Sequence, residues 1–152
     1  MTKDELKQLL QRYKRGTIGE QDIVGMLTSL GSEHLGFATV DHHRQLRQGF
    51  PEVIFCQGKT PKHVAEIAVR IVKRSQPLLA TRATKAHFTA VKKKIRTARY
   101  TEAARTITAN EPKQSKGKHG TILVITAGTS DIPVAEEAVI TARMSGNRVE
   151  TL

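Results

Sequence analysis

Cysteine, tryptophan and long apolar runs are scarce in this 152-residue sequence, and each scarcity excludes a class of protein. The single cysteine, Cys56, cannot form an internal disulfide, and one thiolate cannot hold zinc without histidine or carboxylate ligands. No stretch of about 18 apolar residues exists, and the N-terminal MTKDELKQLLQRYKRG lacks the apolar region of a secretory signal. We therefore expect a cytoplasmic protein that is neither membrane-spanning nor exported and that binds no membrane.

Acidic residues are also scarce, but only in one part of the chain. Residues 59–99 hold twelve Lys or Arg and one Glu, which accounts for the whole formal charge of +11. This concentration predicts a basic face directed at an anionic partner. Aromatic residues make up only 4% of the sequence, and only Phe88 and Tyr100 fall near the basic stretch, so a base-stacking surface is not expected. Nucleic acid is accordingly disfavoured, although a noncatalytic basic polyanion-binding module stays an alternative.

Residues 1–109 carry the pattern of a small α/β domain. Apolar residues at helical spacing predict two helices, at 4–13 and 19–30, followed by an irregular or strand-and-loop stretch at 31–49. Short apolar segments then alternate with amphipathic ones, which favours a β-α-β-α-β unit of parallel strands with crossover helices. The expected strands are residues 52–56, 78–81 and, more weakly, 104–108; the expected helices begin at Pro61, capped by Thr60, and at 85–95, capped by Thr84.

A second unit is expected after a polar linker. Residues 110–120, NEPKQSKGKHG, contain no large apolar residue and resemble a solvated linker. Residues 121–127, TILVITA, form the most hydrophobic strand of the chain and are expected to be buried, with a helix and a second strand completing residues 121–152. Such a β-α-β piece cannot cover both faces of a parallel sheet, so the sequence looks C-terminally truncated at Leu152.

The strongest local signal for a binding site lies between that strand and its helix. Gly128, Thr129, Ser130 and Asp131 are small or polar residues where backbone N–H groups and a helix N-terminus attract an anion. Asp131 would not bind phosphate, but it suits the hydroxyls of a ribose. An ordinary capped turn without a ligand is an equally good interpretation of the spacing.

Four other features are weaker. Arg44 and Arg47 can jointly hold a carboxylate or phosphate, or can form an ion-pair network with Asp41 and Glu52. The sequence Gly58-Lys59-Thr60 lacks the upstream glycine of a phosphate-binding P-loop. Cys56 is better explained as a small core residue than as a nucleophile. The adjacent histidines 42 and 43 lack further ligands at metal-binding spacing, so no metal site is predicted.

Four blocks of the sequence, taken together, resemble a known family. DHHRQLRQGFPEVIFCQGKTP, LLATRA, YTEAART and ILVITAGTSDIPVAEEA, in this order, are similar to the nickel-pincer cofactor biosynthesis family LarB over about residues 41–152. Residues 121–152 resemble the start of the domain that LarB shares with PurE, the aminoimidazole ribonucleotide carboxylase. The resemblance therefore implies a three-layer parallel sheet of flavodoxin or Rossmann type for the second unit, in which Gly128, Thr129, Ser130 and Asp131 hold the phosphate and ribose of a nucleotide.

The resemblance also implies a reaction. LarB-like enzymes carboxylate the pyridinium ring of nicotinic acid adenine dinucleotide with carbon dioxide or bicarbonate and hydrolyse its phosphoanhydride. They use a cysteine thiolate that lies later in the PurE-like domain, beyond the point corresponding to Leu152. No catalytic residue is therefore expected in this chain, which would be inactive alone. Arg44, Arg47, Lys59 and Arg82 would face the negative charges of the dinucleotide.

The same resemblance bears on cofactors, assembly and the alternative reaction. No tightly bound cofactor is expected, and Mg²⁺ is a candidate only for the full-length protein. Full-length relatives form homo-octamers through the PurE-like domain, and this assembly is expected to be impaired here. A PurE-type relative acting on a mononucleotide in purine biosynthesis is the enzymatic alternative.

Overall fold

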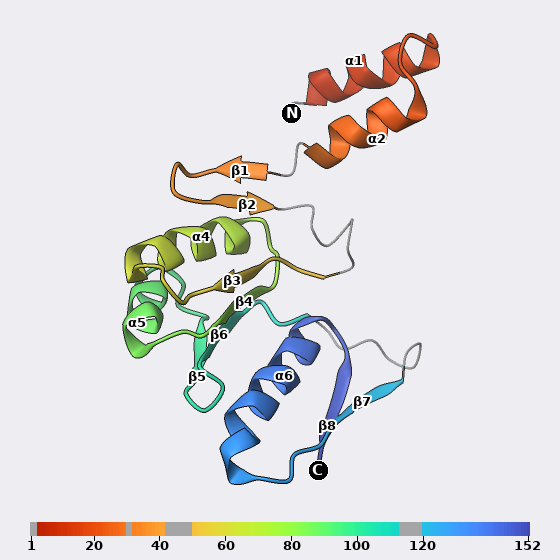
Figure 1. The fold of residues 1–152 in the computed structure, drawn as a ribbon. Helices are drawn as coiled ribbons and strands as arrows, with labels where there is room; N and C mark the ends of the chain where they lie inside the picture. The colour runs from red at the N-terminus through yellow and green to blue at the C-terminus, as the bar shows by residue number, and fades with distance from the viewer. Residues whose placement is uncertain (1–2, 30–31, 42–49, 113–119) are drawn as a thin grey trace.

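The computed structural model describes residues 3–29, 32–41, 50–112 and 120–152, and it confirms the α/β class. The chain begins with the helices α1 (Lys3–Lys14) and α2 (Glu20–Ser29), which contact each other at one end of the molecule (Figure 1). A short antiparallel hairpin of β1 (Ser32–His34) and β2 (Thr39–Asp41) follows, within the stretch for which the sequence predicted strand and loop. No described helix is long and apolar enough to cross a membrane.

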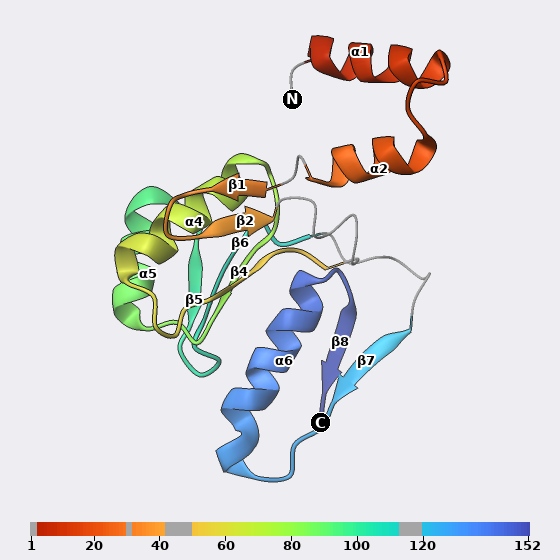
Figure 2. The same cartoon turned by 45° about the horizontal axis from the view of Figure 1, so that its top comes forward.

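The central element is a four-stranded sheet in the order β3-β4-β6-β5. It consists of β3 (Val53–Phe55), β4 (Leu78–Thr81), β5 (Arg99–Thr101) and β6 (Thr106–Ala109). β3 and β4 are parallel and are joined by the crossover helix α4 (Pro61–Lys73), as the sequence predicted. The helix α5 (Lys85–Lys94) follows β4 and packs beside α4 on the same face of the sheet (Figure 2).

The prediction of an all-parallel unit is wrong for the third strand. β6 runs antiparallel to β4, and β5, which the sequence did not predict, pairs with β6 as a hairpin. The reason is the connection: α5 leads directly into β5, and only the short turn between β5 and β6 separates the two strands, which permits antiparallel pairing alone.

Alternating residues of the sheet divide the core into two faces. Ile54, Leu78, Ala80, Ile107 and Ala109 belong to the buried cluster that α4 and α5 cover. Leu79 is also buried, but it points to the other face because successive strand residues alternate. There α6 (Ile132–Met144) contacts β4 and β6, so the sheet is covered from both sides.

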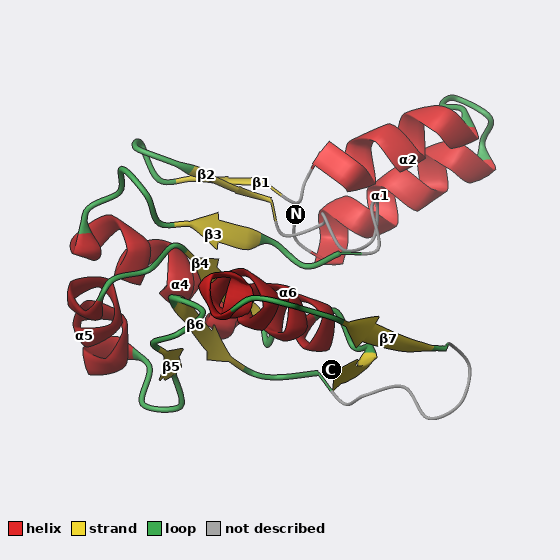
Figure 3. Cartoon of the chain, turned by 60° about the horizontal axis from the view of Figure 1, so that its bottom comes forward, coloured by secondary structure: helices red, strands yellow, loops and turns green. Residues whose placement is uncertain are grey.

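The C-terminal unit is a single β-α-β element. β7 (Thr121–Val124) pairs in parallel with β8 (Arg148–Thr151), and α6 connects them (Figure 3). This topology confirms the predicted strand, helix and strand, and Gly146 follows the helix with φ 85°, as a C-terminal glycine should. The expected burial of the first strand is wrong. Leu123 is 52% exposed and Ile122 is also exposed, because among the described residues only α6 packs on this two-stranded sheet.

Leu152 follows β8 and continues its pairing with the neighbouring strand. Its N–H donates a hydrogen bond of 3.0 Å to the Val124 carbonyl oxygen, and its own carbonyl oxygen accepts one of 3.2 Å from the Thr126 N–H. The Leu152 side chain is 79% exposed. This residue therefore has a backbone role at the edge of the two-stranded sheet, and the prediction that the catalytic residues lie beyond it stays a prediction.

The domain division at 1–109, 110–120 and 121–152 also stays a prediction. Residues 113–119 of the expected linker lie outside the described residues. The sheet unit and the C-terminal unit are connected through this stretch, and they also touch where α6 lies against β4 and β6.

Candidate functional site

Two loops that follow the parallel strands β3 and β4 bring two predicted site residues to the same edge of the sheet. Lys59 lies between β3 and α4, and Arg82 lies between β4 and α5. The strands are in register through Phe55 and Thr81, and the pairing is extended by a hydrogen bond of 2.9 Å from the Cys56 N–H to the Thr81 carbonyl oxygen. The N-termini of α4 and α5 open at this edge, which adds partial positive charge to that of the two side chains.

Both helix starts are fixed by side chains that the sequence singled out. Thr60 Oγ1 accepts a hydrogen bond of 3.2 Å from the His63 N–H and caps α4, whose first residue is Pro61. Thr84 caps α5 in the same way, accepting a hydrogen bond of 3.3 Å from the His87 N–H. Both predicted caps are therefore confirmed, and the two loops have defined conformations.

His87 connects the two loops, and the sequence analysis missed it. Its Nδ1 accepts a hydrogen bond of 3.0 Å from the Thr84 N–H, so the proton of the neutral ring must be on Nε2. Nε2 lies 2.9 Å from the Lys59 carbonyl oxygen, to which it can then donate. A buried histidine at the third position of a helix that follows a threonine cap is the signal that could have identified this contact.

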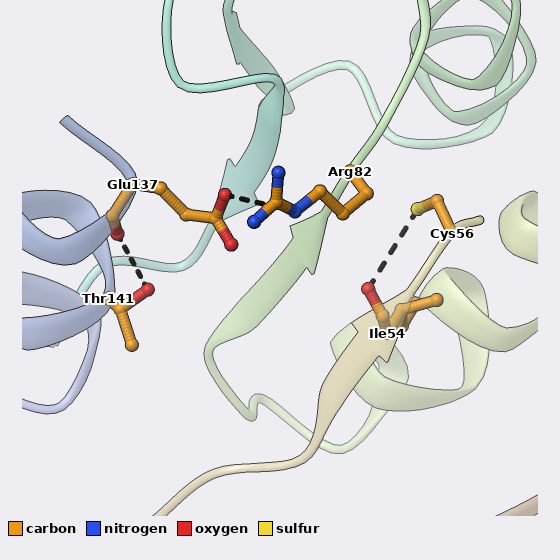
Figure 4. Close-up of polar contacts among 5 residues, drawn as sticks. All are labelled: Ile54, Cys56, Arg82, Glu137 and Thr141. Atoms are coloured by element: carbon orange, nitrogen blue, oxygen red, sulfur yellow. Dashed lines mark hydrogen bonds and ion pairs between the residues drawn. The ribbon is translucent and has the colours of Figure 1, made fainter. Parts of the chain in front are cut away.

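Cys56 ends β3 inside the core, as the sequence predicted. Its side chain is fully buried, and burial raises the pKa of the Cys56 thiol to about 11, although the nearby Lys59 charge acts in the opposite direction. The thiol stays protonated at neutral pH, and its weak contact is to the Ile54 carbonyl oxygen at 3.8 Å (Figure 4). A protonated, inaccessible thiol is a poor nucleophile, which leaves Cys56 as a packing residue.

Arg82 connects the sheet to the C-terminal unit. Its backbone has φ 53°, a left-handed conformation that is uncommon for residues other than glycine. Its Nε lies 3.4 Å from Oε2 of Glu137 in α6. Figure 4 shows the two side chains pointing toward each other. No local pattern indicated this partner, because the two residues are far apart in the chain. Of the two predicted anion-binding side chains at this edge, Lys59 and Arg82, the second is thus already paired with a carboxylate.

The turn at Gly128 holds its polar groups close together. η1 (Thr129–Asp131) is a single 3₁₀ turn in which the Asp131 N–H donates to the Gly128 carbonyl oxygen at 3.1 Å. A Cβ placed on Gly128 would lie 3.5 Å from both Ser130 Oγ and Asp131 Oδ2, so both oxygens lie over the glycine. Asp131 precedes α6 but makes no side-chain capping hydrogen bond. The capping hydrogen bond that the alternative interpretation expected from Asp131 is therefore absent, and whether the turn holds a ligand stays a prediction.

The turn and Arg82 are related through α6. Glu137, the partner of Arg82, is six residues beyond Asp131, which corresponds to about 9 Å along a helix axis. Lys59 and Arg82 are brought together at one edge, and the turn lies one to two helical turns away along α6. Arg44 and Arg47, the other two predicted anion-binding residues, lie outside the described residues.

A cavity of about 340 Å³ lies next to this edge, between β2, β3 and α4. Its wall includes Phe55 from the end of β3, Lys59 from the loop that follows, and Phe37 from the β1-β2 turn. Lys59 Nζ donates a hydrogen bond of 2.9 Å to the Phe55 carbonyl oxygen. The cavity therefore combines aromatic rings with one cation.

Residues 32–112, which are more than half of the chain, match the LarB/PurE-like N-terminal domain family. The match includes the hairpin, the four-stranded sheet and both loops of the candidate site. The chain belongs to this family. This membership indicates that the protein is a relative of the PurE enzyme superfamily.

One curated relative extends the comparison to nearly the whole sequence. An uncharacterized protein of Methanocaldococcus jannaschii is 29% identical over 149 residues, which cover 93% of this chain. They cover only 57% of the relative, so the chain spans little more than half of that protein's length.

Proposed function

We propose that the chain is the N-terminal, substrate-binding part of a LarB-like enzyme that carboxylates and hydrolyses nicotinic acid adenine dinucleotide in nickel-pincer cofactor biosynthesis. Membership of the LarB/PurE-like N-terminal domain family supports the proposal, as does the span of the chain over 57% of its relative. The catalytic thiolate is assigned to a part of the PurE-like domain beyond Leu152, since the buried, protonated Cys56 cannot supply it.

The observation that carries the proposal is the arrangement of the turn at Gly128. Ser130 Oγ and Asp131 Oδ2 lie over the glycine, and Asp131 is not used as a helix cap although it stands in the capping position. The turn thus offers a hydroxyl, backbone N–H groups and a carboxylate at the start of a 13-residue helix. Phosphate binds such N–H groups, and a ribose diol donates to the carboxylate.

The described residues have binding roles in this proposal. Thr129 and Ser130 hold a phosphate, Asp131 accepts hydrogen bonds from ribose hydroxyls, and Lys59 and Arg82 face the remaining negative charge. The bonds to the pyridinium ring would be made in the later part of the PurE-like domain. There the thiolate adds to the ring, and the resulting enamine carbon attacks carbon dioxide. Loss of the ring proton and of the thiolate then restores aromaticity. Water then hydrolyses the phosphoanhydride, which leaves one phosphate monoester on each nucleoside. Mg²⁺ is proposed only for the full-length enzyme.

Titration of the chain with nicotinic acid adenine dinucleotide tests the binding roles. Asp131→Asn should weaken the affinity at least about tenfold, because one charge-assisted hydrogen bond contributes about 1.5–3 kcal/mol. The control Glu111→Gln removes the same charge from an exposed position outside the turn and should change the affinity less than twofold. Equal effects of the two substitutions would contradict the assignment of the turn.

The same titration separates the proposed substrate from that of a PurE-type enzyme. The LarB-like assignment predicts tighter binding of the dinucleotide than of a ribose mononucleotide, because Lys59 and Arg82 can meet charges beyond the first phosphate. Equal affinity for both ligands, unaffected by Arg82→Gln, would favour the mononucleotide enzyme. A full-length relative that carboxylates the dinucleotide would establish the reaction itself.

A further inference from the structure

A second surface runs along α4, from Phe37 near the start of the helix to the C-termini of α4 and α5. Both helices begin at the carboxyl edge of the sheet, so their C-termini lie together at the other edge. A groove of about 520 Å³ is lined by Arg70 and Lys73 of α4, Lys94 of α5, and His34 and Phe37 of the hairpin. Glu66, Arg70 and Lys73 follow one face of α4, about 10 Å long.

The charge of this surface is strongly one-sided. Residues 67–101 contain ten Lys or Arg and no Asp or Glu, although Arg82 and Lys85 of this set lie at the start of α5, on the side of the candidate site. Arg74, Lys93 and Arg96, all exposed, lie at the ends of the same two helices and extend the positive surface beyond the groove. The facing acidic groups are Glu66 in the groove and Glu33, which forms an ion pair of 3.1 Å with Arg70.

The C-termini of α4 and α5 need only part of this positive charge to neutralise their helix dipoles. The C-terminus of a helix carries roughly half a negative charge, which one cation can neutralise. Lys92 serves α5 in this way, since its Nζ donates to the carbonyl oxygens of Arg96 and Ala98 at 2.9 and 2.8 Å. Within the described part of the chain, Lys73 and Lys94 have no ion-pair partner. Their charges are available to an external anion.

An aromatic ring lies at the groove because the fold brings Phe37 of the hairpin, which is distant in the sequence, against α4. Phe37 stacks on His63 of α4, with ring centroids 4.0 Å apart and planes inclined by 12°, and it remains 41% exposed. Phe88 and Tyr100, on which the sequence argument depended, instead stack on each other and are half-buried. His63 and Lys73 are ten residues apart, so the aromatic pair and the last lysine of α4 span about 15 Å.

We propose that this groove, defined by His34, Phe37, Arg70, Lys73 and Lys94, binds single-stranded nucleic acid. Lys73 and Lys94 meet backbone phosphates, Arg70 remains paired with Glu33 at the wall of the groove, and a base stacks on the exposed side of Phe37. Proteins that bind single-stranded nucleic acid without sequence preference combine positive side chains along the nucleic-acid backbone with aromatic rings on which bases stack. An acidic protein would match the positive charge of the groove, but it would not account for the exposed ring of Phe37. The groove shares Phe37 with the cavity beside Lys59, but Lys73 and Lys94 lie at the C-terminal ends of α4 and α5, so the proposal does not depend on the dinucleotide site.

The test is fluorescence anisotropy of the chain with a labelled single-stranded oligonucleotide at several salt concentrations. Lys73→Gln with Lys94→Gln should weaken binding about tenfold and reduce the salt slope by about 1.4, since each phosphate contact to a single strand contributes about 0.7. The matched control, Arg12→Gln with Lys14→Gln, removes two charges from α1 and should leave the slope unchanged. Equal losses in both double variants would show a net-charge effect and overturn the proposal.

Phe37→Leu tests the stacking contact while the position remains apolar. Binding should fall about fivefold, with the salt slope unchanged, because the substitution removes a base contact and no phosphate contact. Circular dichroism confirms that each variant is folded. Failure of the unaltered chain to bind the oligonucleotide, or binding of poly-glutamate with equal affinity, would overturn the assignment to nucleic acid.

Discussion

The strands β4 and β7 have similar apolar sequences, LLAT and TILV, but their environments are opposite. All four residues of β4 are buried, whereas the first three residues of β7 are exposed. β4 lies between two neighbouring strands and is covered by α4 and α5 on one face and by α6 on the other. β7 has one neighbouring strand and one covering helix among the described elements.

An apolar strand is expected to be buried, and the comparison shows that the topology around the strand decides whether it is. A parallel strand is buried only when both faces of its sheet are covered. The sheet unit meets this condition with a buried cluster drawn from residues 40–109. The C-terminal unit contributes only Val139, Met144 and Val149 to the buried hydrophobic residues among those described. The two units should therefore respond differently to the same substitutions.

Truncation of an apolar side chain should show the largest difference. Ile71→Ala, in the fully buried face of α4, should lower the free energy of unfolding by about 2–5 kcal/mol, because it removes buried methylenes and leaves a cavity. Leu123→Ala in β7 should change it by about 0.5 kcal/mol or less. Urea denaturation measures both, and comparable losses would mean that β7 is as well packed as the sheet.

The buried thiol of Cys56 should make stability depend on alkaline pH. Its pKa is about 11 in the folded chain against 9.0 for an ordinary cysteine, so the unfolded chain loses the proton first as the pH rises. The contribution is complete below pH 9.0 and is lost on approaching pH 11, by roughly 2 kcal/mol. Unfolding of the unaltered chain should therefore become easier across this window relative to Cys56→Ala. A constant difference between the two proteins would show that water reaches the thiol.

The helix starts offer a smaller contrast between the units. Thr60→Ala should cost about 1 kcal/mol, since it removes the hydrogen bond that caps α4. Asp131→Ala should cost about 0.5 kcal/mol or less, because Asp131 makes no capping hydrogen bond to α6. Thermal unfolding compares them, and a larger loss for Asp131→Ala would assign that residue to helix stability instead of ligand binding.

The ion pair between the units should contribute least. The Arg82 side chain is 42% exposed, and Glu137 is 22% exposed, so water screens their attraction. A double-mutant cycle with Arg82→Gln and Glu137→Gln should give a coupling of at most about 1 kcal/mol. A coupling well above this value would mean that the pair, more than apolar packing, holds α6 against the sheet.

Sequence reasoning was most successful where the structure depends on neighbouring residues. It predicted both threonine caps, Pro61 at the start of α4, and the strand at residues 78–81. It also placed Cys56 in the core, because a lone cysteine at the end of a β-branched strand is usually a small apolar group. Each of these features depends on a few adjacent residues, whose local preferences the sequence displays directly.

The candidate site was predicted less completely, because its contacts join distant residues. The sequence singled out Lys59 and Arg82, but the partners His87 and Glu137 are 28 and 55 residues away from them. The antiparallel direction of β6 was likewise missed, since β5 is short and has no apolar pattern. The nucleotide roles of Gly128, Thr129, Ser130 and Asp131 stay predictions, as do those of Arg44 and Arg47 and the placement of the catalytic residues beyond Leu152.

The sequence by itself determined the helix boundaries, the apolar strands, the concentration of positive charge in residues 59–99 and the family. Each of these follows from the order of side chains along a short stretch. Only the tertiary structure decided which apolar strand is buried, which loops meet at one sheet edge, and that Phe37 comes to lie beside Arg70 and Lys73. These outcomes depend on covering both faces of a sheet and on contacts between residues far apart in the chain, which local preferences do not fix.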